Sequence, residues 1–320
     1  MGTHAVTNAG TQVAVTAPPS SSARDLVRGA FDMHVHVAPD VVARRIDDVA
    51  LARRFAELEL AGLVLKSHYT ATAERAAVVR GVVPGVAVMG SITLNRAVGG
   101  MNPLAVEIAA REGARVVWMP TVDAVNETAG RTEPRPGDKV PVWAAVQFGL
   151  RERGVEIAPV AVVDDGGHVL PETRDVLATV ASHGLVLATG HLARDEIFAV
   201  VDAALEEGVA QIVITHPEFP SQNLDVEDQV ALAGKGALLE RTFTTPHTGK
   251  VAWERWLANI RAAGPEHSVL ATDLGQVDNP PVEDGLPLLV DRLLAAGFGE
   301  EEVHTMAVSN TRQLAGVPAT

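Results

Sequence analysis

The sequence predicts an α/β fold in which eight strand–helix units close into a (β/α)8 TIM barrel. From residue 29 onward, short runs rich in Val, Ile and Leu alternate with Ala-, Glu- and Arg-rich segments of helical spacing. The short runs are apolar on both faces, which is typical of parallel strands covered by helices. Eight such runs occur in a chain of 320 residues, and barrels of this kind commonly reach that length as one domain.

The order of the elements follows from these runs. Several of the helices expected between strands, such as 47–62, 194–208 and 251–264, end at a glycine, which is a common helix stop. Residues 156–170 hold two apolar runs around Asp-Asp-Gly-Gly and predict a β-hairpin insertion between strands 4 and 5. The expected strands cover residues 30–37, 62–68, 85–94, 114–121, 184–191, 211–217, 236–243 and 268–275.

The N-terminal stretch, residues 1–28, is polar and rich in Pro and Ser, and it predicts a flexible tail ahead of a single domain over 29–320. The formal charge of −14, without a basic stripe, argues against a nucleic-acid partner. No apolar run is long enough for a membrane span, so no membrane partner is expected. The absence of cysteine excludes thiolate ligands and fits a cytoplasmic protein. Any metal must therefore bind to nitrogen and oxygen.

Polar side chains follow the expected strands at the end where each strand stops. In a barrel these ends meet at one mouth, where barrel active sites lie. Alternate strand residues share a face with Cα atoms about 6–7 Å apart, so the imidazoles of His34 and His36 can converge on one ion. The residues expected at the mouth are His34, His36, Lys66, His68, His191, His216 and Asp273.

Four short segments carry a resemblance to a known group of proteins: "DMHVH" from residue 32, "ATGH" from 188, "ITHP" from 214 and "ATDLG" from 271. Near the C-terminus, "VSNTRQLAGV" from 308 is similar to a closing helix with the pattern Asn-x-x-x-Leu-x-Gly. In this order and at barrel spacing, the segments resemble the amidohydrolase superfamily of metal-dependent barrel hydrolases. The resemblance spans residues 30–317.

The resemblance implies a site and a reaction. The four histidines of the segments would bind metal, and Asp273 would bind metal and act as general base, with His216 beside it in the catalytic group. Neutral imidazole and carboxylate suit one or two Zn²⁺ ions, with Mn²⁺ or Fe²⁺ possible. A metal-bound hydroxide would then cleave an amide, lactone or ester bond of a small organic substrate. Proteins of this type commonly self-associate, so we expect a homo-oligomer. The implied ligands are His34, His36, His191, His216 and Asp273.

The fourth strand departs from the superfamily pattern. Binuclear members usually carry a lysine or glutamate there that bridges two ions, whereas this strand ends "RVVWMPT". Either the site holds one metal, or Lys66 supplies a carboxylated bridge as a catalytic metal ligand; an unmodified Lys66 could instead hold a substrate anion. The one-metal reading keeps open a nonoxidative decarboxylase of an aromatic or unsaturated acid. An alternative of another class is a noncatalytic metal- or ligand-binding barrel.

Other side chains near the expected mouth are candidates for substrate contact. The long Pro- and Gly-rich connection at 122–143 predicts a lid, and its Arg131 and Lys139 could anchor an anion. Glu240 either lines the mouth or pairs with Arg241, and Asp32 is expected to support the site without binding metal. The substrate-binding candidates are His68, Arg96, Trp118, Glu240 and His247.

Overall fold

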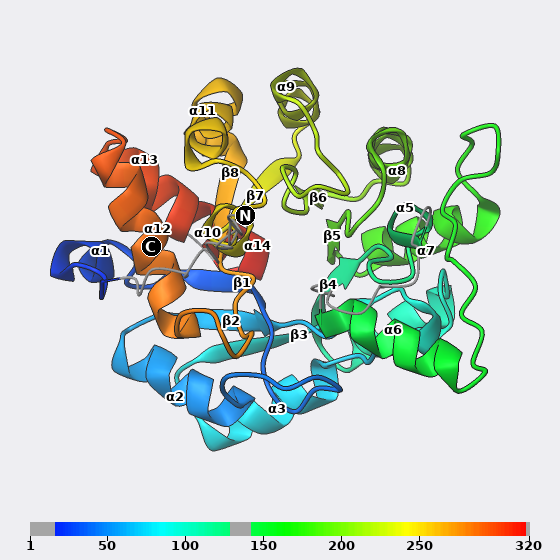
Figure 1. The fold of residues 1–320 in the computed structure, drawn as a ribbon, viewed down its shortest axis with the longest axis horizontal. Helices are drawn as coiled ribbons and strands as arrows, with labels where there is room; N and C mark the ends of the chain where they lie inside the picture. Colours follow the sequence, from blue (N-terminus) through cyan, green and yellow to red (C-terminus); the bar gives the residue numbers. More distant parts are fainter. Residues whose placement is uncertain (1–16, 129–141, 318–320) are drawn as a thin grey trace, which may run out of the picture.

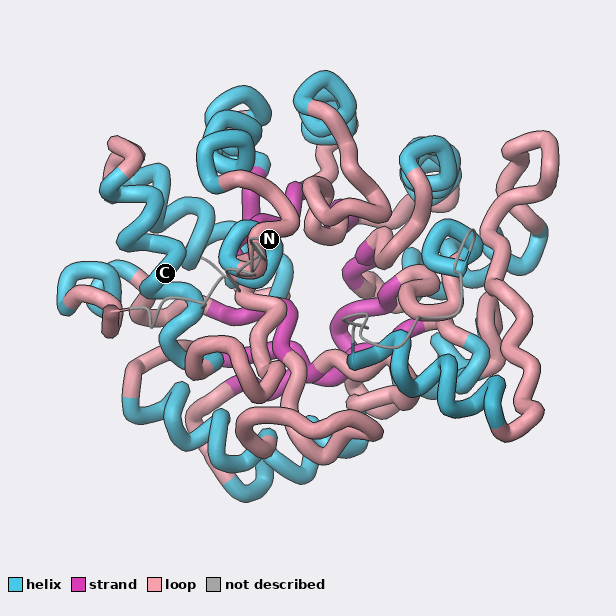
Figure 2. The backbone as a smooth tube through the Cα atoms, viewed as in Figure 1, coloured by secondary structure: helices cyan, strands magenta, loops and turns pink. Residues whose placement is uncertain are grey.

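The computed structural model describes residues 17–128 and 142–317, and within them it contains one eight-stranded parallel sheet with the strands in chain order. Figures 1 and 2 show the strands around the centre and the helices outside them. The predicted (β/α)8 barrel is confirmed. The strands are β1 (Phe31–Val35), β2 (Gly62–Leu65), β3 (Ala87–Thr93), β4 (Ala114–Trp118), β5 (Val186–Ala188), β6 (Gln211–Ile214), β7 (Leu238–Thr242) and β8 (Ser268–Ala271).

The sheet closes where the last strand meets the first. The backbone N–H of Asp273 donates to the carbonyl of His34 at 2.9 Å, and the N–H of His36 donates to the carbonyl of Leu274 at 2.8 Å. Val35 and Leu274 form a parallel bridge between these two bonds. The closure therefore runs through the residues that the sequence placed at the mouth.

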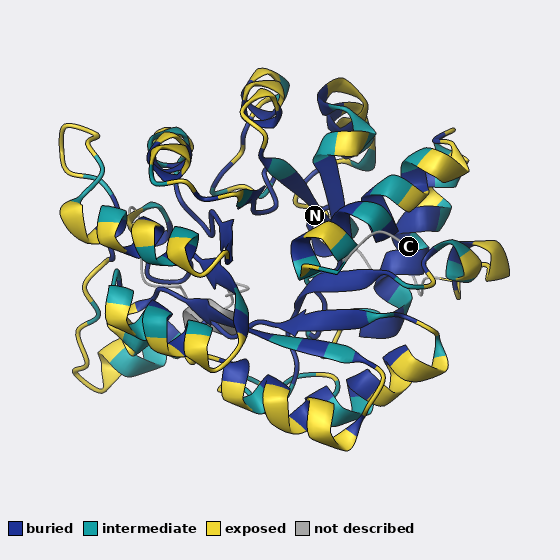
Figure 3. Ribbon diagram, turned by 180° about the vertical axis from the view of Figure 1, so that it is seen from behind, coloured by how far each residue is buried: buried dark blue, intermediate teal, exposed yellow. Residues whose placement is uncertain are grey.

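One helix follows each strand and packs outside the barrel. Figure 3 shows the strands buried and the outer faces of the helices exposed. Asp47 and Asp225 cap two of these helices by accepting backbone N–H bonds, as N-cap residues do. The eight helices are α2 (Asp48–Glu57), α3 (Ala73–Val82), α4 (Pro103–Arg111), α7 (Pro171–Ser182), α8 (Arg194–Glu206), α9 (Val226–Gly234), α11 (Trp253–Ala263) and α12 (Val282–Ala295).

Nine further helical segments lie outside the eight strand–helix units among the described residues. Within the described residues, none of the helices combines the length and the apolar character needed to cross a membrane. The additional elements are α1 (Ser21–Leu26), η1 (Arg96–Val98), α5 (Val125–Thr128), α6 (Val142–Glu152), α10 (Thr244–His247), η2 (Pro265–His267), α13 (Glu300–His304), η3 (Thr305–Ser309) and α14 (Asn310–Ala315).

Two expectations differ from what the structure describes. The predicted β-hairpin over 156–170 is not confirmed, because this stretch forms no strand and only one isolated antiparallel bridge, between Val163 and Val169. The backbone of Val160, in the first of the two apolar runs, forms a parallel bridge with Ala124 and does not pair with the second run. Residues 17–28 were assigned to a flexible tail, yet they include α1, which packs against α12 and buries Ala23.

The C-terminal helix α14 closes the lower end of the barrel. The Asn310 side chain donates to the carbonyls of Glu266 and Ser268, and Thr311 accepts the Phe31 N–H at 3.1 Å. Leu314 is buried among the side chains that fill the barrel interior. These contacts give a physical reason for the Asn-x-x-x-Leu pattern seen in the sequence.

The strands stop earlier than predicted, and their polar residues stand in the turns that follow. β5 ends at Ala188 and β8 at Ala271, so His191 and Asp273 lie just beyond the sheet. His216 and Asp273 have φ angles of 25° and 52°, in the left-handed region that non-glycine residues rarely adopt. Such strained backbone is common at functional sites.

A glycine at the barrel closure makes a testable prediction. Gly275 has φ of 131°, and a Cβ there would lie 1.5 Å from the carbonyl oxygen of His36. Gly275→Ala should therefore lower the free energy of unfolding by about 2 kcal/mol or more. The matched control is Gly81→Ala in exposed α3, where no atom lies within 4 Å of the new Cβ. The control should stabilise by up to about 1 kcal/mol, and equal urea midpoints for the two variants would contradict the close approach.

Candidate metal and active site

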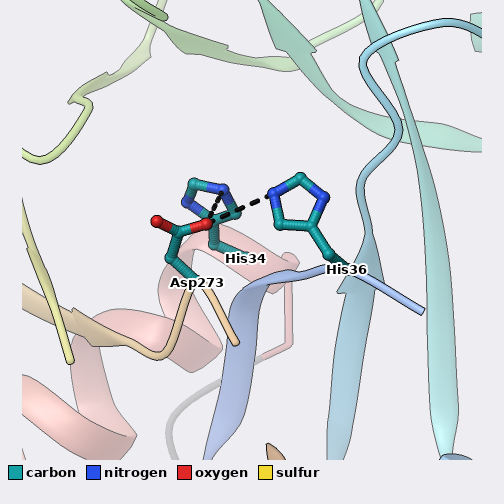
Figure 4. A group of neighbouring side chains, drawn as sticks. All are labelled: His34, His36 and Asp273. Atoms are coloured by element: carbon teal, nitrogen blue, oxygen red, sulfur yellow. Dashed lines mark ion pairs between the residues drawn. The ribbon is translucent and has the colours of Figure 1, made fainter. Parts of the chain in front are cut away.

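Two imidazoles and one carboxylate form the centre of the mouth. Oδ1 of Asp273 lies 3.2 Å from Nε2 of both His34 and His36. Figure 4 shows the three side chains pointing toward one another from β1 and from the turn after β8. One nitrogen or oxygen of each residue lies within 4.8 Å of the others, which is close enough for one cation to reach all three.

A local irregularity in β1 turns these histidines inward. The pairing with β2 shifts register between Asp32 and Val35. Met33 packs in the barrel interior, and the ring centroid of His34 lies 4.6 Å from that of Trp118, also in the interior. Val35 then returns to the outer core, and His36 turns to the mouth again. This irregularity in the strand allows two successive side chains, those of Met33 and His34, to face the barrel interior.

Glu240 orients the first histidine. Its Oε1 accepts from Nδ1 of His34 at 3.1 Å, and its Oε2 accepts the backbone N–H of His216 at 3.2 Å. A proton held on Nδ1 leaves Nε2 as the unprotonated nitrogen of His34, and Nζ of Lys66 lies 2.9 Å from it. This is how carboxylates fix the tautomer of metal-binding histidines.

His191 is oriented in the same way by a residue that the sequence did not suggest. Its Nδ1 lies 2.8 Å from Oε1 of Glu127, in α5. Glu127 is itself held by the hydroxyl of Ser221, which donates at 2.8 Å. The ring of His216 lies 5.1 Å from that of His191 and 6.2 Å from that of His34. His191 and His216 therefore adjoin the three-residue cluster without belonging to it.

The cluster opens into a cavity of about 200 Å³. At the bottom, His68 places its Nδ1 2.8 Å from the hydroxyl of Thr121, and its ring lies 5.0 Å from that of His36. The cavity is small compared with common ligand pockets of about 300–1,000 Å³. Its inner wall includes His36, Lys66, His68, His191, His216 and Asp273.

Burial keeps most of the imidazoles neutral. It lowers the pKa of His36, His68 and His216 well below the ordinary value, and it lowers the pKa of His191 against the opposing effect of Glu127. Burial and Lys66 also act to lower the pKa of His34, but Glu240 and Asp273 raise it overall. Neutral imidazole is the form that binds a metal.

The carboxylate at the centre behaves in the opposite way. Although burial acts to raise it, the pKa of Asp273 lies well below its ordinary value because His34 and His36 stabilise the anion. The Thr244 hydroxyl donates to Oδ2 at 2.8 Å. Asp273 is therefore ionised at neutral pH and oriented by three neighbours.

Lys66 is enclosed within the site. Its Nζ lies 2.9 Å from Nε2 of His34 and 4.0 Å from the centre of the Trp118 ring. Burial lowers the pKa of Lys66 to about 8, against the attraction of Asp273 and Glu240. The ammonium form therefore predominates at neutral pH and places a positive charge beside the ligands.

The substrate candidates fall into different places. His68 lines the cavity. Trp118 and Glu240 lie deeper and face the barrel interior, because they belong to strands and not to the loops above them. Arg96 donates to the carbonyls of Ala158 and Pro159, and the ring of His247 packs on Phe243; neither lines the cavity. Arg131 and Lys139, with most of the expected lid, lie outside the described residues.

Two further expectations concern residues behind the site. Asp32 supports the site, since it accepts the N–H of His34 at 3.2 Å and both the N–H and hydroxyl of Thr272. Burial raises the pKa of Asp32 to about 7 against these bonds. Arg241 does not pair with Glu240; it faces outward to Glu218, because neighbouring strand residues point to opposite faces.

Sequence reasoning missed the residues that rim the cavity. They are spread over loops without periodic pattern, so no spacing identified them. Lys250 places its Nζ 3.9 Å from the centre of the Phe219 ring, and Gln276 donates to the backbone carbonyl of Asp273. The rim residues include Arg44, Tyr69, Phe219, Lys250, Gln276 and Asn279.

Comparison with protein families gives a match over most of the barrel. Residues 29–240 match the family described as "Family of unknown function (DUF6282)". The chain belongs to DUF6282. The matched part of this DUF6282 member holds the four histidines and Glu240 and stops before Asp273. No curated protein matches the sequence.

Solved structures share the fold of this DUF6282 protein at low identity. An amidohydrolase from Pseudomonas aeruginosa has a TM-score of 0.58 and 12% identity, with 92% of this chain and 99% of that one covered. The probable dipeptidase PvdM from Pseudomonas aeruginosa has a TM-score of 0.61 and 10% identity, with 92% and 97% covered. An amidohydrolase from Burkholderia multivorans with bound zinc has a TM-score of 0.52 and 13% identity, with 90% and 99% covered. The resemblance to the amidohydrolase superfamily is thus confirmed for the fold.

The residues present fit a divalent cation. Two imidazoles and an ionised carboxylate provide the nitrogen and oxygen ligands that Zn²⁺, Mn²⁺ and Fe²⁺ accept. Nδ1 of His216 is buried and has no hydrogen-bond partner among the described residues. An unpaired buried nitrogen costs about 1–3 kcal/mol, which a ligand bound there would offset.

The carboxylate behind His34 gives a second prediction. Glu240→Gln should weaken Zn²⁺ binding by about 10- to 100-fold, because the His34 tautomer is no longer fixed by a charged acceptor. Titration calorimetry in the presence of a competing chelator measures this directly. Glu254→Gln in α11 is the matched control, since Glu254 is exposed on the outer surface. Equal affinity in the two variants would show that Glu240 does not act on the metal.

The buried imidazoles predict how stability depends on pH. In the unfolded chain their rings bind protons near pH 6.5, whereas burial keeps four of them neutral when folded. The unfolded state therefore binds more protons as the pH falls, and the free energy of unfolding decreases. Asp32 and His34 act in the opposite direction but are fewer. The urea midpoint of the metal-free protein should decrease when the pH is lowered from about 7.5 to about 5.5. An increase over this range would contradict the balance of these pKa shifts.

Proposed function

We propose that this DUF6282 protein is a metal-dependent hydrolase that cleaves an amide, lactone or ester bond of a small organic substrate. The proposal depends mainly on one observation, the ionised Asp273 held between two imidazoles at the wall of an open cavity. The similar solved structures include a dipeptidase and a lactonase template, whose names refer to amide and lactone bonds. Because their identity to this chain is low, these structures support only the fold, and the class of bond cleaved is our proposal.

The metal would be held by His34, His36 and Asp273, with His191 and His216 beside it. A bound divalent cation supplies Lewis acidity, which polarises a carbonyl group and acidifies water. Glu240 and Glu127 hold the Nδ1 atoms of His34 and His191, which leaves the Nε2 atom of each ring as the nitrogen that would bind a cation. The chain therefore holds the ligands in the form that a cation needs.

The proton transfers are assigned to Asp273. Its depressed pKa keeps the carboxylate ready to accept a proton from the attacking water at neutral pH. Thr244, which donates to Oδ2, leaves Oδ1 to face the cluster. The same carboxyl group then delivers the proton to the leaving group as the carbonyl–heteroatom bond breaks.

Lys66 is assigned an electrostatic part in the reaction. Its ammonium packs against Trp118 and lies 2.9 Å from Nε2 of His34, and we assign it to stabilise the negative charge that a bound carbonyl oxygen would gain. A positive charge on a buried side chain such as Lys66 stabilises such charge more than it would in bulk water. Lys66→Met should therefore reduce kcat more than it raises KM.

Replacement of the central carboxylate tests the proposal. Asp273→Asn should lower kcat at least about 100-fold on any ester, lactone or amide that the zinc-loaded protein hydrolyses, because general base catalysis is lost. Asp278→Asn is the matched control, since Asp278 lies exposed nearby. A panel of such substrates, assayed with added zinc, would show release of acid. Release of CO₂ instead would favour the decarboxylase, and unchanged turnover in Asp273→Asn would refute the mechanism.

A further inference from the structure

The cavity carries a charge opposite to that of the chain. The formal charge of the protein is −14, yet the cavity is lined by three cations, Arg44, Lys66 and Lys250, and by one carboxylate, Asp273. The other nearby carboxylates stand behind the wall, where Glu240 and Glu127 hold histidines. A bound divalent ion would add further positive charge. The basic side chains Arg44, Lys66 and Lys250 thus face the cavity, although the chain as a whole is acidic.

Arg44 is held in place at one side of the cavity. Its Nε donates to Oδ2 of Asp40 at 2.8 Å, its Nη2 lies 2.7 Å from the same oxygen in an ion pair, and its side chain is 6% exposed. Nη2 also lies 3.3 Å from Nδ1 of His36, so the guanidinium reaches the edge of the metal cluster. Nη1 makes no hydrogen bond to any described residue. A fixed planar guanidinium with free N–H donors is well suited to bind a carboxylate.

Lys250 supplies positive charge on another side. Its Nζ lies over the ring of Phe219, which packs against the rings of His191 and His216, whereas Arg44 adjoins His36. Nζ has no ion-pair partner within the part of the chain that the structure describes. Arg44 therefore lies beside His36 of the cluster, whereas Lys250 lies on the side of His191 and His216, and both cations line the cavity.

The neutral donors of the rim are already engaged. The Thr244 and Thr248 hydroxyls donate to Asp273 and to the Thr244 carbonyl, at 2.8 and 2.7 Å. Gln276 donates to the backbone carbonyl of Asp273, and Asn279 donates to Gln276. The guanidinium of Arg44 and the ammonium of Lys250 remain the charged donors at the rim that are open to a ligand.

We propose that the site binds a compact carboxylic acid, whose carboxylate is held by Arg44 while Lys250 contributes a second positive charge across the cavity. This inference rests on the proposed hydrolase and names its substrate class: small molecules with a free carboxylate beside the bond to be cleaved. The cavity of about 200 Å³ has room for a compact acid.

The test uses glutarate as the probe and glutaramide as its uncharged counterpart. Titration calorimetry on the zinc-saturated protein and again after chelator treatment separates binding to the protein from binding to the metal. Glutarate should bind in both states and glutaramide at least about tenfold more weakly, because charge-assisted bonds are the stronger ones. Arg44→Met should weaken glutarate binding by about tenfold or more, and Lys250→Met by about threefold or more.

Matched controls separate a specific site from net charge. Arg53→Met on the exposed face of α2 and Lys235→Met beside Asp202 remove the same charges elsewhere and should change the affinity by less than about twofold. Because Arg44→Met leaves Asp40 unpaired, the double variant Asp40→Asn, Arg44→Met gives the same test with no buried charge left over. Arg44→Lys should give intermediate binding, since the charge remains but the planar fork is lost.

The outcomes distinguish this inference from the proposed reaction. Equal binding of glutaramide, or undiminished glutarate binding in both Arg44 variants, would overturn the carboxylate site even if esters are still hydrolysed. Binding by the chelator-treated wild type that is lost in the Arg44 variants would support it even if Asp273→Asn leaves turnover unchanged.

Discussion

The closure of the last strand onto the first is the constraint on which the rest of the structure depends. Two backbone hydrogen bonds, from Asp273 to His34 and from His36 to Leu274, join β8 to β1. The same residues carry the side chains of the central cluster, so the backbone register sets the distance between carboxylate and imidazoles. Strain at Asp273 is tolerated because both flanking backbone groups are hydrogen-bonded across this seam. His34, His36 and Asp273 therefore close the barrel through their backbones and form the cluster through their side chains.

Around this seam, charge is arranged in layers. Glu240, Glu127 and Asp40 stand behind the cavity wall, and each neutralises or orients a basic side chain in front of it. The basic side chains therefore face the cavity while their counter-charges are hidden. This arrangement allows a strongly acidic protein to line its cavity with basic side chains. It also gives the buried carboxylates and basic side chains partners, without which their burial would be costly.

Much of this design was predictable from sequence, and the exceptions have physical causes. His34, His36 and Asp273 follow strands whose apolar runs are easy to recognise, and parallel strands bring their ends together. Trp118 and Glu240, which the sequence suggests as substrate contacts, lie deeper in the barrel than the cavity, because strand ends predicted from composition do not reveal how far into the barrel a side chain lies. Loop residues such as Arg44 and Glu127 follow no period, so only coordinates could assign them.

The plug formed by α14 has a consequence for how the protein is made. Leu314 fills the base of the barrel, and Thr311 binds the backbone of Phe31 at the start of the first strand. While the chain emerges from the ribosome, β1 has neither its neighbour β8 nor this floor until β8 and α14 have both been synthesised. A nascent polypeptide therefore cannot assemble the cluster of His34, His36 and Asp273 before the residues that follow β8 have emerged.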